Sequence, residues 1–197
     1  TGRPTISVSP KKLGAGDIAV ITVKGAVGPV EGTFLKKRLH FNENKGIYKA
    51  SAGIDLSTEP GTYSLDVTIG KKKASRDVKI SKKKYPVQRL TLRDDLVTLS
   101  PENEARAERD QKRVAALWPV DSLRMWVGTF VNPLPGREIG TPFGVRRIIN
   151  NIPKNSHSGV DITADEGEPV KAPNDGVVVL VDEQFFSGKS VIIDHGD

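Results

Sequence analysis

The chain of 197 residues contains no cysteine. This absence excludes disulfides, thiolate metal sites and a cysteine nucleophile, but it does not decide the cellular compartment. No apolar run is long enough to span a bilayer, and the first four residues, Thr1 to Pro4, lack the pattern of a signal peptide. We therefore expect no transmembrane segment, and any export signal has been removed or lies outside this sequence.

Histidine is scarce, with only His40, His157 and His195. His40 lies in an alternating stretch that is typical of an ordinary strand, and we assign it no chemistry. His157 precedes Asp161 by four residues in the run Asn-Ser-His-Ser-Gly-Val-Asp-Ile. An imidazole and a carboxylate at this spacing form a candidate ligand pair for a divalent metal such as zinc.

The local sequence favours a strand over a helix around this pair. Gly159 and the β-branched Val160 and Ile162 disfavour a helix. In a strand the side chains of His157 and Asp161 point to the same face. The spacing alone also fits a surface histidine beside a turn aspartate, so the surrounding motifs decide between the two interpretations.

Charge is unevenly distributed along the chain. Residues 1–80 carry 14 basic and 7 acidic side chains, whereas residues 118–197 carry 7 and 11. The basic half has no aromatic-rich motif for nucleic acid, so we expect no nucleic-acid partner and interpret the lysines as a solvated surface. Attraction to anionic wall polymers or to an acidic membrane surface is the second interpretation.

Residues 1–80 contain short apolar-alternating runs separated by turns, which predicts an immunoglobulin-like β-sandwich. Pro60-Gly61 forms a turn, and Tyr63 opens a strand in which Leu65, Val67 and Ile69 alternate inward. No catalytic constellation lies in this domain. The predicted strands are 5–8, 18–23, 33–35, 39–41, 47–50, 63–69 and 74–80.

Residues 81–118 are predicted to form a linker with one helix. Ser100 is a suitable N-cap, Pro101 suits the first helical position, and acidic residues follow in the first turn. The helix is expected from Pro101 to Leu117, ending before Pro119. Its charged sequence predicts a largely exposed connector.

Residues 119–197 form the third predicted segment, which is rich in β-strands. Hydrophobic residues make up 37% of the whole chain, which is enough to supply packed cores. Together with the sandwich and the connecting helix, it gives a mainly β fold class whose last domain is an antiparallel sheet. The predicted strands are 127–131, 160–163, 170–172, 176–181 and 190–194.

Several motifs in this last segment occur in one order and at a spacing typical of one family. They are Thr-Pro-Phe-Gly-Val-Arg-Arg (141–147), His-Ser-Gly-Val-Asp-Ile (157–162), Gly-Glu-Pro-Val-Lys-Ala-Pro (167–173), Asp-Gly-Val-Val (175–178) and Ser-Gly-Lys-Ser-Val-Ile-Ile-Asp-His-Gly (187–196). The segment from about residue 124 to residue 197 closely resembles the lysostaphin-type, or LytM-like, zinc endopeptidases. This resemblance covers a little over a third of the chain.

The resemblance implies that His157 and Asp161 are zinc ligands in the N-terminal part of a peptidase domain. It also implies that Arg146 is structural and that His195 is a turn residue after a strand. A catalytic zinc has three protein ligands and an open position for water. The third ligand and the catalytic histidines are expected in segments beyond Asp197, so we expect that the chain is truncated and that this segment alone is inactive.

The function implied by the resemblance is a zinc-dependent endopeptidase that hydrolyses peptide cross-links of bacterial peptidoglycan. Such a protein would be periplasmic, attached to the cell envelope or extracellular, and the N-terminal domain could occlude its groove. Two alternatives remain open. One is a catalytically inactive relative that binds peptidoglycan or activates another wall hydrolase, and the other is an envelope adhesion module.

Overall fold

The structure is a computed structural model that describes residues 3–91 and 99–196. It divides into two compact units. The first runs to Val87 and also includes Gly144–Arg146, and the second contains Gln88–Phe143 and the chain from Arg147 onward. Strands predominate in both units and the described residues contain a single helix, so the predicted mainly β class is confirmed.

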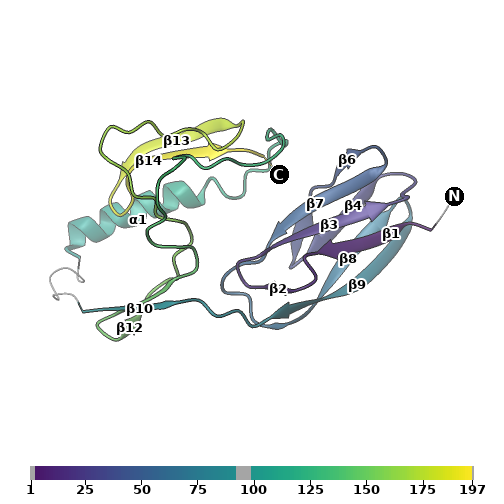
Figure 1. Cartoon of the computed structure of the whole chain (residues 1–197), viewed down its shortest axis with the longest axis horizontal. Helices are drawn as coiled ribbons and strands as arrows, with labels where there is room; N and C mark the ends of the chain where they lie inside the picture. Colours follow the sequence, from purple (N-terminus) through teal and green to yellow (C-terminus); the bar gives the residue numbers. More distant parts are fainter. Residues whose placement is uncertain (1–2, 92–98, 197) are drawn as a thin grey trace. The chain divides into compact units, whose positions relative to one another are not determined.

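The first unit consists of two sheets (Figure 1). All strand pairs in them are antiparallel except β2 with β9, which is parallel. The four-stranded sheet has the order β1 (Thr5–Ser9), β3 (Ile18–Lys24), β7 (Ile47–Gly53), β6 (Asn42–Asn44). The five-stranded sheet has the order β2 (Leu13–Gly14), β9 (Lys72–Ser81), β8 (Gly61–Ile69), β4 (Val30–Phe34), β5 (Lys37–Leu39).

A single hydrophobic core lies between these two sheets, because alternate residues of each strand turn the same way. Leu65 and Val67 of β8 are buried together with Ile21 and Val23 of β3 and with Phe34 of β4. Each of these side chains is at most 2% exposed. Every predicted run of this unit overlaps a strand, whereas the immunoglobulin-like assignment stays a prediction.

The strands that the sequence did not predict are held by their neighbours. β6 is polar, with the sequence Asn-Glu-Asn, and pairs with β7 across a two-residue turn at Lys45-Gly46. Both turn residues have positive φ, 51° and 74°, which is the conformation that matches the twist of a hairpin. The turn and the pairing with β7, rather than hydrophobic alternation, therefore determine this edge strand.

The second unit contains a small three-stranded sheet and a longer hairpin (Figure 1). The sheet has the order β10 (Val87–Leu90), β11 (Arg146–Ile149), β12 (Ile152–Pro153). The first residues of β10 and β11, Val87 and Arg146, belong to the first unit. The hairpin pairs β13 (Val177–Gln184) with β14 (Gly188–Asp194), which confirms the last two predicted strands.

Three predicted strands of the second unit, 127–131, 160–163 and 170–172, are wrong, because the structure has no ladder there. The amide of Asn174 takes the place of a neighbouring strand at Val127, accepting from its N–H and donating to its carbonyl at 3.1 Å each. Pro133 and Pro173 lack the N–H that a continuous ladder needs, and only their carbonyls accept bonds. Hydrophobic β-branched runs therefore remain extended but irregular.

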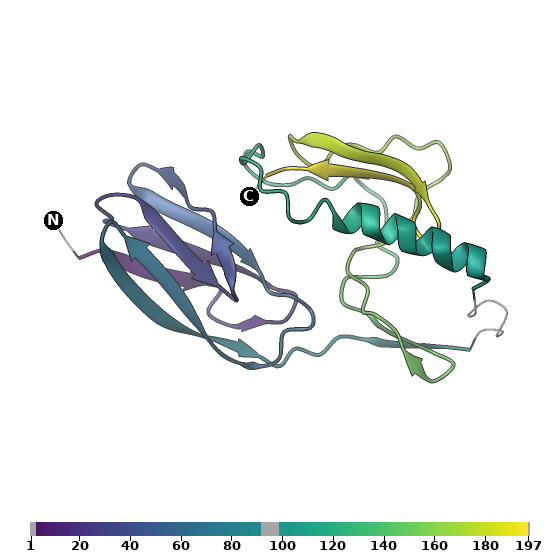
Figure 2. The ribbon, with the colours of Figure 1, turned by 180° about the vertical axis from the view of Figure 1, so that it is seen from behind.

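The helix α1 (Pro101–Ala115) begins as predicted, with the Ser100 hydroxyl accepting from the N–H of Asn103. It runs alongside the β13–β14 hairpin, as both views show (Figures 1 and 2). Arg106 donates to the carbonyl of Glu183 at 3.1 Å, and the carboxylate of Asp110 accepts from the N–H of Phe185 at 2.8 Å. Within the described residues, no helix is long and apolar enough to cross a membrane.

One ion pair fastens the end of the first unit to the loop that precedes β3. The carboxylate of Asp17 accepts from the N–H of Gly14 at 2.8 Å and pairs with the ammonium of Lys83. The hydrogen bond from Lys83 lowers the pKa of Asp17 below its ordinary value. The carboxylate of Asp17 therefore binds a proton more weakly in the folded first unit than in the unfolded chain.

We expect Asp17→Asn to lower the free energy of unfolding at pH 7 by up to about 1 kcal/mol. A depressed folded pKa stabilises fully above the unfolded pKa of about 3.9, and the stabilisation is lost as the pH falls through the folded pKa. Urea unfolding between about pH 6 and pH 3 should show the wild-type advantage shrinking as the pH falls. An advantage that is constant or grows in acid would contradict this. Asp77→Asn, at an exposed position on β9, is the control.

Candidate metal site

The structure brings the side chains of His157 and Asp161 together without a strand. Nε2 of His157 lies 3.2 Å from Oδ1 of Asp161. The chain bends at Gly159 instead of extending. The strand on which the sequence prediction rested is therefore absent, although the two side chains still meet. The imidazole is largely buried and the carboxylate is 53% exposed.

Backbone pairing between two motif segments positions Asp161. Its N–H donates to the carbonyl of Thr141 at 2.9 Å, and its carbonyl accepts from the N–H of Gly140 at 2.9 Å. Ile139 and Ile162 form an antiparallel bridge, and Thr163 donates to Glu138 at 3.0 Å. These bonds hold the carboxylate in place from a segment 20 residues upstream.

Arg147 is the residue that sequence reasoning missed. Its Nη2 lies 3.8 Å from Oδ2 of Asp161, and its Nε donates to the amide oxygen of Gln88 at 3.3 Å. The sequence drew attention to Arg146 instead, whose N–H donates to the carbonyl of Pro86 at 2.9 Å. Adjacent residues of a strand face opposite sides, so only one of the two arginines could reach the carboxylate, and the sequence contains no signal for which.

The His157–Asp161 pair fits two of the three protein positions of a catalytic zinc site. Nε2 of His157 is buried and is not aligned for a hydrogen bond with any described residue, although it lies beside Oδ1 of Asp161. A nitrogen and a carboxylate oxygen are both donors that zinc accepts. Within residues 3–91 and 99–196, no third histidine, cysteine, aspartate or glutamate joins them in a metal-holding group.

His195 has a structural environment. Its Nδ1 lies 2.7 Å from the carbonyl oxygen of Asp175, and Phe130 packs edge-on against its ring with 5.0 Å between centroids. Its own carbonyl accepts from the N–H of Met125 at 2.9 Å. These contacts fit the turn role that the resemblance implies, and the assignment of His195 as a non-ligand stays a prediction.

Two further motif carboxylates are held by hydrogen bonds. Arg137 donates to Glu168 at 2.7 Å and lowers its pKa. The hydroxyl of Ser122 donates to Asp194 at 2.6 Å and lowers the pKa of that carboxyl. Both carboxylates are therefore ionised at neutral pH. Through them the motifs at 167–173 and 187–196 are linked to Arg137 and Ser122, which precede His157 in the chain.

Comparison with known proteins supports the resemblance. The sequence pattern of peptidase family M23 matches residues 155–197. The chain is also similar to the crystal structure of a Pseudomonas aeruginosa protein assigned to peptidase M23, with 26% identity and a TM-score of 0.71. That similarity covers 94% of this chain and 70% of the other. No curated protein matches the chain significantly. The two matches support the LytM-like family and a peptidase.

Gly144, in the first motif, has a steric requirement for glycine. Its φ is +85°, and a Cβ built on it would lie 2.2 Å from the ring of Tyr85. Tyr85 is itself held by a hydrogen bond from its hydroxyl to the carbonyl of Ala15 at 2.8 Å. The first unit thus holds Gly144, which lies two residues before the start of β11 and three before Arg147.

We expect Gly144→Ala to destabilise the first unit by at least about 1–2 kcal/mol, from the left-handed backbone alone, with the ring contact adding to this. Removing the ring as well, in Gly144→Ala with Tyr85→Ala, should abolish the part due to the clash. The two substitutions should therefore be non-additive in urea unfolding. Gly53→Ala is the control, because a Cβ there meets nothing within 4 Å. Equal effects at Gly144 and Gly53 would contradict this account.

Proposed function

We propose that the protein is a zinc-dependent endopeptidase that hydrolyses peptide cross-links of bacterial peptidoglycan. The observation that carries this proposal is the meeting of His157 and Asp161 inside the segment that matches peptidase family M23. Peptidoglycan as substrate rests on the resemblance, and so does a location in the periplasm, the cell envelope or outside the cell.

In this proposal the two side chains hold zinc through Nε2 of His157 and a carboxylate oxygen of Asp161. A zinc ion held there would acidify a water molecule and polarise the scissile carbonyl. Arg147 faces Oδ2 of Asp161, which leaves Oδ1 toward His157. The backbone bonds from Gly140 and Thr141 keep this carboxylate from moving away.

We expect His157→Ala to weaken zinc binding by the chain at least tenfold, because it removes the only nitrogen donor of the pair. The affinity is measured by competition with a chromophoric chelator at pH 7.5. His195→Ala is the matched control, since its ring is already engaged with Asp175 and Phe130. Equal zinc affinities of the wild type and His157→Ala would show that the site lies elsewhere.

The activity is tested on purified peptidoglycan with the protein at its native length. We expect new amino termini to appear, their release to stop with a chelator, and zinc to restore it. His157→Ala should lose at least about 100-fold in rate, while His40→Ala should remain active. Binding to peptidoglycan without any release of amino termini would overturn the enzyme and favour a non-catalytic binding protein.

A further inference from the structure

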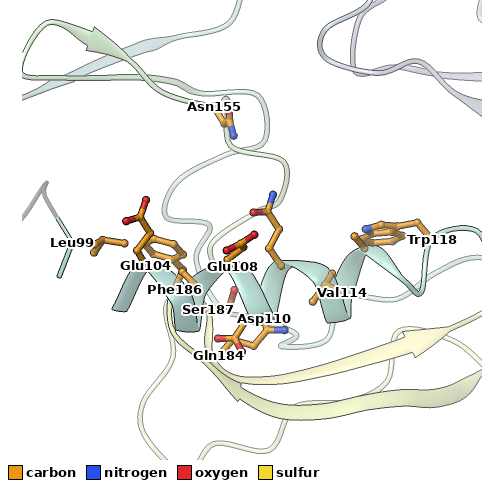
Figure 3. A pocket seen from close by; sticks show the side chains of 13 residues that line it. Leu99, Glu104, Glu108, Asp110, Val114, Trp118, Asn155, Gln184, Phe186 and Ser187 are labelled. Carbon is orange, nitrogen blue, oxygen red and sulfur yellow. The ribbon is translucent and has the colours of Figure 1, made fainter. Parts of the chain in front are cut away.

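A cavity of about 740 Å³ lies along one side of α1 in the second unit (Figure 3). The helix provides one wall, the turn of the β13–β14 hairpin provides another, and Leu99 and Asn155 complete the lining (Figure 3). It is lined by Leu99, Glu104, Ala107, Glu108, Asp110, Gln111, Val114, Ala115, Trp118, Asn155, Gln184, Phe186 and Ser187.

Four of the seven helical lining residues follow one stripe, and Ala107, Asp110 and Val114 line the cavity beside it. Glu104, Glu108, Gln111 and Ala115 are separated by three or four positions, so they lie above one another on the same face. The helix has no fully buried residue, and this stripe remains uncovered in the described structure. From residue 104 to residue 115 the stripe is about 16 Å long at 1.5 Å per residue. An extended peptide of about five residues spans that length.

The lining has one sign of charge. It includes three carboxylates and no lysine, arginine or histidine, in a chain whose net charge is +6. Glu108 pairs with Lys112 at 2.7 Å, and Asp110 accepts from the backbone of Phe185. The carboxylate of Glu104 has no ion-pair or hydrogen-bond partner among the described residues. Of the lining carboxylates it is the one that no residue in 3–91 or 99–196 pairs with, and we assign it to a cationic group.

Two exposed aromatic side chains, Trp118 and Phe186, also line the cavity. Each is 75% exposed, which is unusual for rings of this size. Large apolar side chains left open beside a cavity are typical of a binding surface.

A buried amide lies between the helix and the hairpin beside the cavity. Gln184 is only 9% exposed and lines the cavity where the helix faces the hairpin (Figure 3). Its Nε2 has no hydrogen-bond acceptor within the part of the chain that the structure describes. Nε2 has less than 1 Å² of accessible surface, so Gln184 shapes the cavity without offering its donor to a ligand.

We propose that this cavity binds a cationic peptide segment. A lysine or arginine side chain of the peptide pairs with Glu104, and an apolar side chain packs on Trp118 or Phe186. The carboxylates repel nucleic acid and anionic lipid headgroups, and the length of the stripe fits several peptide units rather than one small cation. This binding site goes beyond the proposed peptidase function and uses neither His157 nor Asp161.

The test uses a fluorescein-labelled pentapeptide, Lys-Leu-Lys-Leu-Lys, and the metal-free chain, with binding measured by fluorescence anisotropy in 50 mM salt. Saturable binding is expected, with affinity for Glu-Leu-Glu-Leu-Glu at least tenfold weaker. Glu104→Gln should weaken the binding of the lysine peptide at least fivefold. Glu102→Gln is the matched control, because it removes the same charge from the first turn of the same helix outside the cavity lining, and it should change affinity less than twofold.

Trp118→Ala is the second variant, and it should weaken binding at least threefold while circular dichroism shows an unchanged fold. Equal effects of Glu102→Gln and Glu104→Gln would mean attraction to the general charge of the helix and would overturn the cavity site. Equal binding of the two peptides would overturn it as well. Because the experiment contains no zinc, its outcome is independent of the proposed peptidase.

Discussion

The site depends on one backbone interaction, the pairing of residues 138–141 with residues 161–163. Three hydrogen bonds of 2.9–3.0 Å and one bridge join these segments. They hold Asp161 where it meets His157 on one side and Arg147 on the other. Because main-chain groups make these bonds, the position of the carboxylate depends on the path of the chain rather than on any one side chain.

Where one face of an element is buried, the sequence predicted the structure well. Leu65, Val67 and Ile69 alternate in β8 and are buried as expected, and Ser100 with Pro101 correctly marks the start of α1. In both cases the signal is local. Alternation with a period of two predicts a strand, and a cap residue predicts a helix start, whatever structure surrounds them.

The second unit was harder to predict because its backbone bonds are not local. Residues 127–131 have the hydrophobic, β-branched composition of a strand, yet the side chain of Asn174 and the carbonyl of Pro173 satisfy their amides. The His157–Asp161 pair could be predicted, but through a strand that does not form. Neither the approach of Arg147 nor the cavity beside α1 leaves a pattern in the sequence, since each depends on segments tens of residues apart.

Zinc is the central element of this account, and anomalous X-ray diffraction from crystals of the zinc-loaded protein tests it most directly. The account predicts an anomalous peak at the zinc edge about 2.0–2.2 Å from Nε2 of His157 and from a carboxylate oxygen of Asp161. A zinc ion bound by other residues, with His157 and Asp161 still paired to each other, would contradict the account.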